Sequence, residues 1–220
     1  MIKRVNTSDQ VYEILRDRIV SLVLKPRDLL SRAELALSFG VSQTPVRDAL
    51  LRLESIGLVR IFPQSRTEVA PIDPDQIEAV RFFRRGLELE AALTVAEQLT
   101  PVGLAALKEV HRALKAASRA ETDRNVFMLV DKQFHKKLFE LADQIDLHQL
   151  VEERSVHLDR LRLLQLPLAG KRKMIIAEHG AVIDAIESRN EAKIVASMRQ
   201  HIKGTGKKIL ELQALYPNYF

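Results

Sequence analysis

One aspartate and three histidines in the second half of the chain are residue types that bind transition metals. Asp131 and His135 are four residues apart, which places both side chains on one face of a helix. His179 and His201 each fall on the apolar stripe of a later helical pattern. Because buried polar side chains need partners, one divalent cation shared by these residues would satisfy all four. The pattern therefore indicates a site for zinc, nickel, manganese or iron.

Two other interpretations of these residues remain open. A single histidine on an apolar stripe is more often a hydrogen-bonded core residue than a metal ligand, and His111 occupies such a position too. A histidine-rich site with an open coordination position can also activate water, as in a metal-dependent hydrolytic enzyme. The sequence has no His-Glu-x-x-His string, and no second carboxylate or histidine is placed as a general base on the same helix faces.

Two arginines are candidates for binding a small anionic effector. Arg84 and Arg154 each lie on the apolar stripe of a predicted helix. A guanidinium grips a carboxylate through two parallel hydrogen bonds, and a neighbouring metal would take further oxygens. The alternative is that each arginine extends its head group to solvent or pairs with a core carboxylate such as Glu88 or Glu90.

The elements that position these residues are predicted to be helices. From residue 73 onward, six stretches carry helical apolar stripes and are joined by short connections, which predicts an all-α six-helix bundle. Arg160 and Arg162 lie in the fourth stretch and are weaker effector candidates, because they fit a solvated edge. The stretches are about 73–99, 101–118, 125–142, 146–165, 171–189 and 191–215.

The first 72 residues follow a different pattern. After a helix from about Ser8, a capping box at 31–34 opens a short helix that Gly40 ends, and a second helix begins at Ser42. Residues 58–70 have the pattern of two strands joined by a polar turn. Three helices followed by a hairpin form the order of a winged helix-turn-helix.

The helix that begins at Ser42 has the features of a recognition helix. Thr44 and Arg47 point outward near its amino-terminal end, where a helix entering the major groove contacts bases and phosphates. Alone, it is equally compatible with an amphipathic surface helix, and the neighbouring helix and hairpin favour the DNA-binding interpretation. Its inward stripe consists of Val46, Ala49, Leu50, Leu53 and Ile56.

The string Gly40-Val-Ser-Gln-Thr-Pro-Val-Arg-Asp-Ala-Leu50 resembles the amino-terminal domain of the GntR family of bacterial transcription regulators. The resemblance extends over most of residues 8–71, including Leu30 to Ala36 and Leu53 to Val59. It implies a winged helix-turn-helix that binds double-stranded DNA as a dimer. The residues that it places against DNA are Arg32, Ser42, Gln43, Thr44, Arg47 and Arg66.

Several of these positions depart from the family pattern. Family members usually carry arginine where this chain has Ala33, with an acid in place of Arg32, and they commonly carry a second arginine in place of Gln43. In the hairpin, Arg66 replaces a usual glycine. These positions help to read the operator in the family, so the resemblance predicts the fold and leaves the base sequence open. Gln43 would favour adenine where arginine would favour guanine.

The second half resembles the FCD effector domain, which defines one branch of that family. Asp131-Lys-Gln-Phe-His135-Lys-Lys-Leu138 is similar to its Asp-x-x-Phe-His-x-x-Leu signature, and His179 and His201 match its later histidines in helix position. The resemblance covers most of residues 75–215. It implies a metal bound by these four residues beneath a cavity for a small organic acid. Gln144 and Gly180 depart from the signature, which would alter the pocket.

Composition is consistent with these expectations. The 220 residues are 46% hydrophobic, enough for one or two packed domains. A formal charge of +5 mildly favours a polyanionic partner. The absence of cysteine excludes disulfides and cysteine-bound zinc, and it fits a reducing cytosol. No signal-like or membrane-spanning apolar run is present, so we expect a cytoplasmic protein without a membrane partner.

The sequence therefore predicts a mainly α protein with two domains. Residues 1–72 form a winged helix-turn-helix DNA-binding domain, and residues 73–220 form an all-α, FCD-like domain that binds ligand and metal. We expect a homodimeric repressor that binds a near-palindromic operator and responds to a small carboxylate effector. A further alternative is a constitutive DNA-binding protein whose bundle only dimerises, its cavity filled by side chains.

Overall fold

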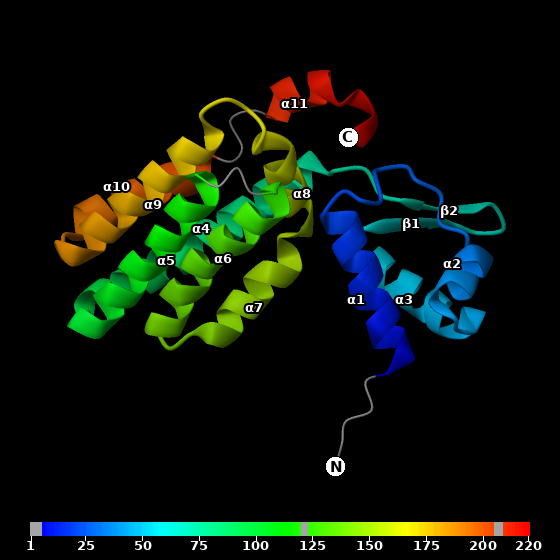
Figure 1. Ribbon diagram of the computed structural model, residues 1–220, viewed down its shortest axis with the longest axis horizontal. Coiled ribbons are helices and arrows are strands. Elements are labelled where there is room, and N and C mark those ends of the chain that lie inside the picture. Colours follow the sequence, from blue (N-terminus) through cyan, green and yellow to red (C-terminus); the bar gives the residue numbers. More distant parts are fainter. Residues whose placement is uncertain (1–5, 120–122, 205–208) are drawn as a thin grey trace, which may run out of the picture. The chain divides into compact units, whose positions relative to one another are not determined.

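The computed structural model describes residues 6–119, 123–204 and 209–220 (Figure 1). The chain divides into two compact units. The first unit contains the residues up to Pro74 together with Leu210–Phe220, and the second unit is Asp75–Ile209. The C-terminal segment thus groups with the first unit, whereas the sequence assigned all of 73–220 to the second domain. Within the described part of the chain, no helix is long and apolar enough to cross a membrane.

The first unit has the predicted order of three helices and a hairpin. Helices α1 and α2 both pack against α3, and the two strands pair antiparallel from Val59 opposite Val69 to Phe62 opposite Arg66. The winged helix-turn-helix prediction is therefore confirmed. The elements are α1 (Thr7–Val20), α2 (Arg32–Phe39), α3 (Gln43–Ser55), β1 (Val59–Phe62) and β2 (Arg66–Val69).

Local sequence signals account for the helix boundaries in this unit. The Ser31 hydroxyl accepts a hydrogen bond from the Glu34 amide at 3.3 Å, and Gly40 ends α2 with a φ of +65°. Ser42 is the residue before α3, but its side chain makes no capping hydrogen bond. The inward stripe of α3 is buried as predicted at Val46, Ala49, Leu50 and Leu53, which fixes which face of the helix remains exposed.

The second unit is the predicted all-α bundle. Helix α5 packs against α6 and α9, and α9 packs against α10 (Figure 1). The core between them contains Leu107, Phe134, Val182 and Met198, all fully buried. The elements are α4 (Pro74–Glu97), α5 (Pro101–Arg119), α6 (Arg124–Leu141), α7 (Ile145–Arg154), α8 (Val156–Gln165), α9 (Lys171–Glu187) and α10 (Glu191–Gly204).

Two predicted helices are described in two parts each. Of the predicted sixth helix, the structure describes α10 and α11 (Ile209–Leu215), and residues 205–208 between them lie outside the described part. The predicted fourth helix is divided at Ser155, whose hydroxyl donates to the Val151 carbonyl at 2.6 Å.

The division at Ser155 changes which side chains point inward. Arg154 is exposed in the last turn of α7, whereas every residue of α8 is buried, including Arg160 and Arg162. Treating 146–165 as one helix had put Arg154 on the inward stripe and Arg160 and Arg162 on a solvated edge. Both placements are wrong, because α8 is a separate helix that is buried on every side, whereas Arg154 ends α7 on its exposed side.

Candidate DNA-binding surface and metal centre

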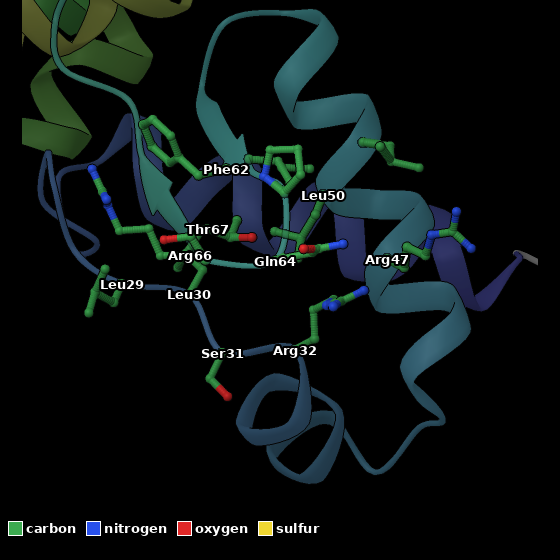
Figure 2. Close-up of a pocket in the computed structure, with 14 residues that line it drawn as sticks. Leu29, Leu30, Ser31, Arg32, Arg47, Leu50, Phe62, Gln64, Arg66 and Thr67 are labelled. Atoms are coloured by element: carbon green, nitrogen blue, oxygen red, sulfur yellow. The ribbon is translucent and has the colours of Figure 1, made fainter.

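An open groove of about 760 Å³ lies between α3 and the hairpin (Figure 2). Arg32, Arg47 and Arg66 line it, and the three come from α2, α3 and β2. Apolar side chains, among them Leu50 and Phe62, line the same groove. Three guanidiniums around an open groove form a surface that can contact phosphates and base edges.

The structure leaves all six residues that were predicted to contact DNA exposed. Besides the three arginines, Ser42 and Thr44 line a neighbouring depression of about 550 Å³ near the start of α3. Gln43 is the first residue of α3. The three arginines therefore line the groove, and Ser42 and Thr44 line a second depression at the start of α3.

Two residues of the hairpin refine this picture. Arg66 donates to Glu68 at 2.8 Å, and its guanidinium lies 4.1 Å from the centroid of the Phe62 ring, so it is held at the groove edge. Gln64 adopts a left-handed backbone with a φ of +56° in the turn, and Figure 2 shows its side chain pointing toward α3. Gln64 was not among the residues predicted to contact DNA, because the sequence shows only that it lies in a polar turn.

The candidate metal centre brings together the four residues that the sequence predicted. Ligand atoms of His135 in α6, His179 in α9 and His201 in α10 all lie within 4.8 Å of one another, and the three residues are buried. Asp131 Oδ1 lies 3.5 Å from His179 Nε2, and Asp131 Oδ2 lies 3.9 Å from His135 Nε2. Three helices thus contribute one compact donor set.

Two carboxylates orient two of these imidazoles. Glu88 Oε2 lies 2.8 Å from His135 Nδ1, and Glu178 Oε2 lies 3.2 Å from His201 Nδ1. Donation from each Nδ1–H leaves the two Nε2 atoms, 3.5 Å apart, with their lone pairs directed into the cluster. A carboxylate behind a ligating histidine is the usual outer support of a metal site, and neither glutamate was predicted in that role.

The unpaired polar atoms of the cluster also fit a metal. Among the described residues, both ring nitrogens of His179 and Asp131 Oδ1 are buried without a hydrogen-bond partner. The His179 ring is held by Phe134, which stacks on it with centroids 4.0 Å apart. Buried polar atoms without partners are costly, and a divalent cation bound to Asp131 Oδ1 and to one ring nitrogen of His179 would remove the part of that cost that these two atoms carry.

Two arginines lie against the cluster. Arg84 donates through Nε to Glu88 at 2.6 Å, and its Nη2 lies 3.3 Å from His135 Nδ1. Arg84 therefore pairs with the core carboxylate Glu88, which is one of the two alternatives that the sequence left open, and it also borders the site. Arg162 donates to Asp131 Oδ2, so this weaker sequence candidate takes the place expected for Arg154.

Burial and neighbouring charges determine the ionisation of the carboxylates. Burial alone would raise the pKa of Asp131, but the Arg162 guanidinium and the nearby imidazoles outweigh it and lower that pKa. Burial opposes ionisation of Glu88 in the same way, and Arg84 and His135 hold its pKa well below the ordinary value. Both carboxylates are therefore charged at neutral pH.

The pKa values of two imidazoles, those of His179 and His135, are shifted in the direction that metal binding requires. Burial lowers the pKa of His179 well below its ordinary value, and the neighbouring His201 lowers it further. Burial also lowers the pKa of His135, against the opposing effect of Glu88. Neutral imidazoles beside an ionised Asp131 are the protonation states in which these groups act as metal ligands.

A small cavity adjoins the cluster. Its volume is about 10 Å³, room for about one water molecule. Three cationic side chains and one carboxylate are among the lining residues, so an organic acid would enter only if side chains moved. The lining residues are Arg84, Arg162, Lys171, Ile175, Glu178, His201 and Ile202.

His111 is a hydrogen-bonded histidine outside this site. Its Nε2 lies 2.9 Å from the Ile176 carbonyl oxygen. Gly180 gives the ring its space, because a Cβ at that position would lie 3.1 Å from His111 Cε1. The departure at Gly180 from the family signature thus affects the contact with His111, and neither residue is among those that line the cavity.

A winged helix-turn-helix joined to a helical domain with a buried histidine cluster is the architecture of a DNA-binding protein with a second, separate domain. The family model for bacterial regulatory proteins of the gntR family matches residues 7–69, and the FCD domain model matches residues 79–204. The chain belongs to the gntR family, in the branch with an FCD effector domain. It is a transcriptional regulator that binds DNA, and FCD domains bind small-molecule effectors.

Individual relatives agree with this assignment. The chain is 31% identical over 217 residues to an HTH-type transcriptional regulator in an unstable DNA locus of Streptomyces ambofaciens, covering 99% of this chain and 90% of that protein. It is 27% identical over 214 residues to the HTH-type transcriptional repressor RspR of Escherichia coli K12, covering 97% and 93%. These comparisons support the predicted regulator and not the hydrolytic enzyme.

Solved structures show the same fold. Escherichia coli McbR/YncC aligns with a TM-score of 0.73 at 23% identity, covering 98% of this chain and all of that one. A GntR regulator from Rhodococcus sp. RHA1 aligns with a TM-score of 0.74 at 18% identity, covering 93% and 97%. At these identities the likeness shows the architecture alone.

Replacing Arg47 with alanine tests the DNA-binding surface. Arg47 is exposed on α3, so Arg47→Ala should leave the melting temperature unchanged. Loss of a base contact should cost about 1–3 kcal/mol on particular operator sequences, whereas loss of a phosphate contact should weaken all sequences alike. Fluorescence anisotropy with a set of DNA duplexes measures this, with Arg112→Ala on the second unit as control. Wild-type affinity of Arg47→Ala for every duplex would contradict the assignment of α3.

The pH dependence of stability tests the burial of the histidines. The pKa of His179 is lower in the folded protein than its ordinary 6.5, so the unfolded chain binds more protons as pH falls through that value. With a chelator present, the melting temperature should therefore fall from about pH 7.5 to about pH 5.5. His179→Leu, which places an apolar side chain that cannot titrate against Phe134, should reduce this fall. An equal fall in both proteins would show that His179 does not titrate as buried.

Proposed function

We propose that this regulator is a homodimeric repressor whose operator affinity depends on a metal and a small carboxylate bound in the second unit. The observation that carries the proposal is the cluster of three buried imidazoles and Asp131, in which Asp131 Oδ1 and both ring nitrogens of His179 have no hydrogen-bond partner among the described residues. His135, His179, His201 and Asp131 would hold the ion. A bound ion would supply a Lewis-acid position for an effector oxygen. Zinc, nickel, manganese and iron all accept these ligands.

The charges around the cluster favour an anionic effector. Three carboxylates face two guanidiniums, so the cluster carries one negative charge, and a divalent cation would leave one positive charge in excess. Excess charge in a buried site is costly, and a carboxylate ligand would offset it. The groups that enter this balance are Glu88, Asp131, Glu178, Arg84 and Arg162.

The first unit supplies the DNA-binding half of the proposal. Arg32 and Arg47 line the exposed groove between α3 and the hairpin, where guanidiniums can reach phosphates and guanine edges. Two first units related by the two-fold axis of a homodimer would read a near-palindromic operator. A name that includes repressor, as for the relative RspR, supports repression over activation.

The small cavity favours one second candidate. At about 10 Å³, it holds about one water molecule, as expected if the metal and side chains fill the bundle and no organic acid enters. The protein would then be a constitutive DNA-binding regulator with a structural metal. The two functions differ in whether an organic acid stabilises the metal-loaded protein.

Removing the metal should destabilise the protein. Binding to the native state alone stabilises it, by about 2.7 kcal/mol when the free ligand is at 100 times its dissociation constant, so chelation should lower the melting temperature. His179→Ala should reduce the metal content on elemental analysis and leave DNA binding by the effector-free protein intact. His111→Ala is the control, because His111 lies outside the cluster. Protein that neither contains nor takes up a transition metal would refute the metal assignment.

Organic acids should raise the melting temperature of the metal-loaded protein. Sugar acids, hydroxy and keto acids and aromatic acids form the test panel, each measured with and without the ion. Because Arg162 borders both Asp131 and the cavity, Arg162→Gln should weaken the response, whereas the exposed Arg154→Gln should keep it. If no acid shifts the melting temperature or changes DNA affinity, the constitutive alternative holds.

A further inference from the structure

The C-terminal segment Leu210–Phe220 belongs to the first unit although it follows the helices of the second. It contains most of α11 and the short 3-10 helix Pro217–Tyr219. The segment lies beyond both family matches, which end at residues 69 and 204. Its contacts are therefore a property of this chain that neither family model describes.

Three hydrogen bonds fasten the end of this segment within the first unit. Arg27 donates through Nε to the Asn218 carbonyl at 3.2 Å and through Nη2 to the Phe220 carbonyl at 3.1 Å. The Ile72 amide donates to the Tyr219 carbonyl at 2.6 Å. The carbonyls of three consecutive residues thus accept hydrogen bonds from the loop between α1 and α2 and from the residues that follow the hairpin.

The Arg27 position is held firmly by its own backbone contacts. The Arg27 amide donates to the Val69 carbonyl at 2.8 Å, and the Val69 amide donates to the Asp28 carbonyl at 2.9 Å. Arg27 adopts a φ of +73°, which a non-glycine residue rarely takes unless its surroundings impose it. This loop is therefore fixed to β2, and it presents the guanidinium to the C-terminal segment.

The chain passes between the two units twice, after Pro74 and after Ile209, the first residue of α11. Ile72 lies just before the first passage, and Tyr219 lies in the segment that follows the second. The helix before α11 is α10, whose last turn carries His201. The hydrogen bond from Ile72 to Tyr219 thus connects a residue near the first passage with the end of the C-terminal segment.

We propose that the C-terminal segment is a tether that transmits occupancy of the histidine cluster to the first unit through Arg27 and Ile72. The inference rests on the proposed metal site, because it takes His201 as a ligand. An ion that fixes His201 would restrict the last turn of α10, and the C-terminal segment follows α10 in the chain. Occupancy of the cluster would then make opening of the attachment less favourable, and coupling of this kind acts in both directions.

Hydrogen exchange of the full-length protein tests the tether, with Zn²⁺ alone as the ligand. In the wild type, Zn²⁺ should slow exchange in the last turn of α10 and also at Tyr216, Tyr219 and Ile72. Arg27→Ala removes both guanidinium hydrogen bonds and keeps a non-glycine residue at this φ. It should speed exchange at the attachment by about tenfold and abolish its response to Zn²⁺, while α10 still responds.

A matched control and a second variant make the outcomes distinct. Arg52→Ala changes another arginine of the first unit, which pairs with Asp9 at 2.7 Å and stacks on Tyr12, and it should leave the Zn²⁺ response of the attachment intact. Deleting residues 217–220 should abolish that response, as Arg27→Ala does.

Each further result contradicts one specific claim. If Zn²⁺ slows α10 but not the attachment in the wild type, or if Arg27→Ala keeps the full response, the tether is refuted and the metal site stands. If both variants unfold the first unit, the segment is a structural part of that unit and the tether is refuted. If Zn²⁺ changes nothing at α10, the proposed metal function itself fails, and the tether fails with it.

Discussion

The buried imidazoles of His135, His179 and His201 impose a requirement that much of the bundle serves. An apolar core cannot hold several polar rings without partners, because each unpaired nitrogen loses its hydrogen bonds to water. Carboxylates from α4, α6 and α9 meet part of this demand, and guanidiniums from α4 and α8 neutralise two of those carboxylates in turn. Five helices are thereby joined around one polar centre, so their arrangement and the chemistry of the site depend on each other.

Two opposing physical demands are met by different units of the chain. Cations that bind DNA phosphates must be exposed, and Arg32 and Arg47 are. A selective site for a small ligand must exclude water, and the histidine cluster is buried. Because one surface cannot meet both demands, the exposed cations and the buried donor set lie in different units of the chain.

The sequence predicts the structure best where the structure depends on local spacing. The helical period placed Asp131 and His135 on one face, and caps and glycines marked the helices of the first unit. Local spacing does not reveal a helix break within a continuous apolar pattern, or which distant segments meet. The helix break at Ser155 exchanged the roles expected of Arg154 and Arg162, since apolar residues continue on both sides of the break. The attachment of the C-terminal segment depends on a pairing between residues almost two hundred positions apart, which no local pattern encodes.

The pairing within the centre also bears on how a metal and an anion can influence each other. Asp131 uses separate oxygens: Oδ2 accepts from Arg162, and Oδ1 faces His179. Glu88 likewise binds Arg84 through one oxygen and His135 through the other. Each carboxylate therefore connects a cation that borders the cavity with a candidate metal ligand. An anion that drew either guanidinium toward itself would leave more of the carboxylate's charge to stabilise the metal, and by linkage the metal would favour that anion equally.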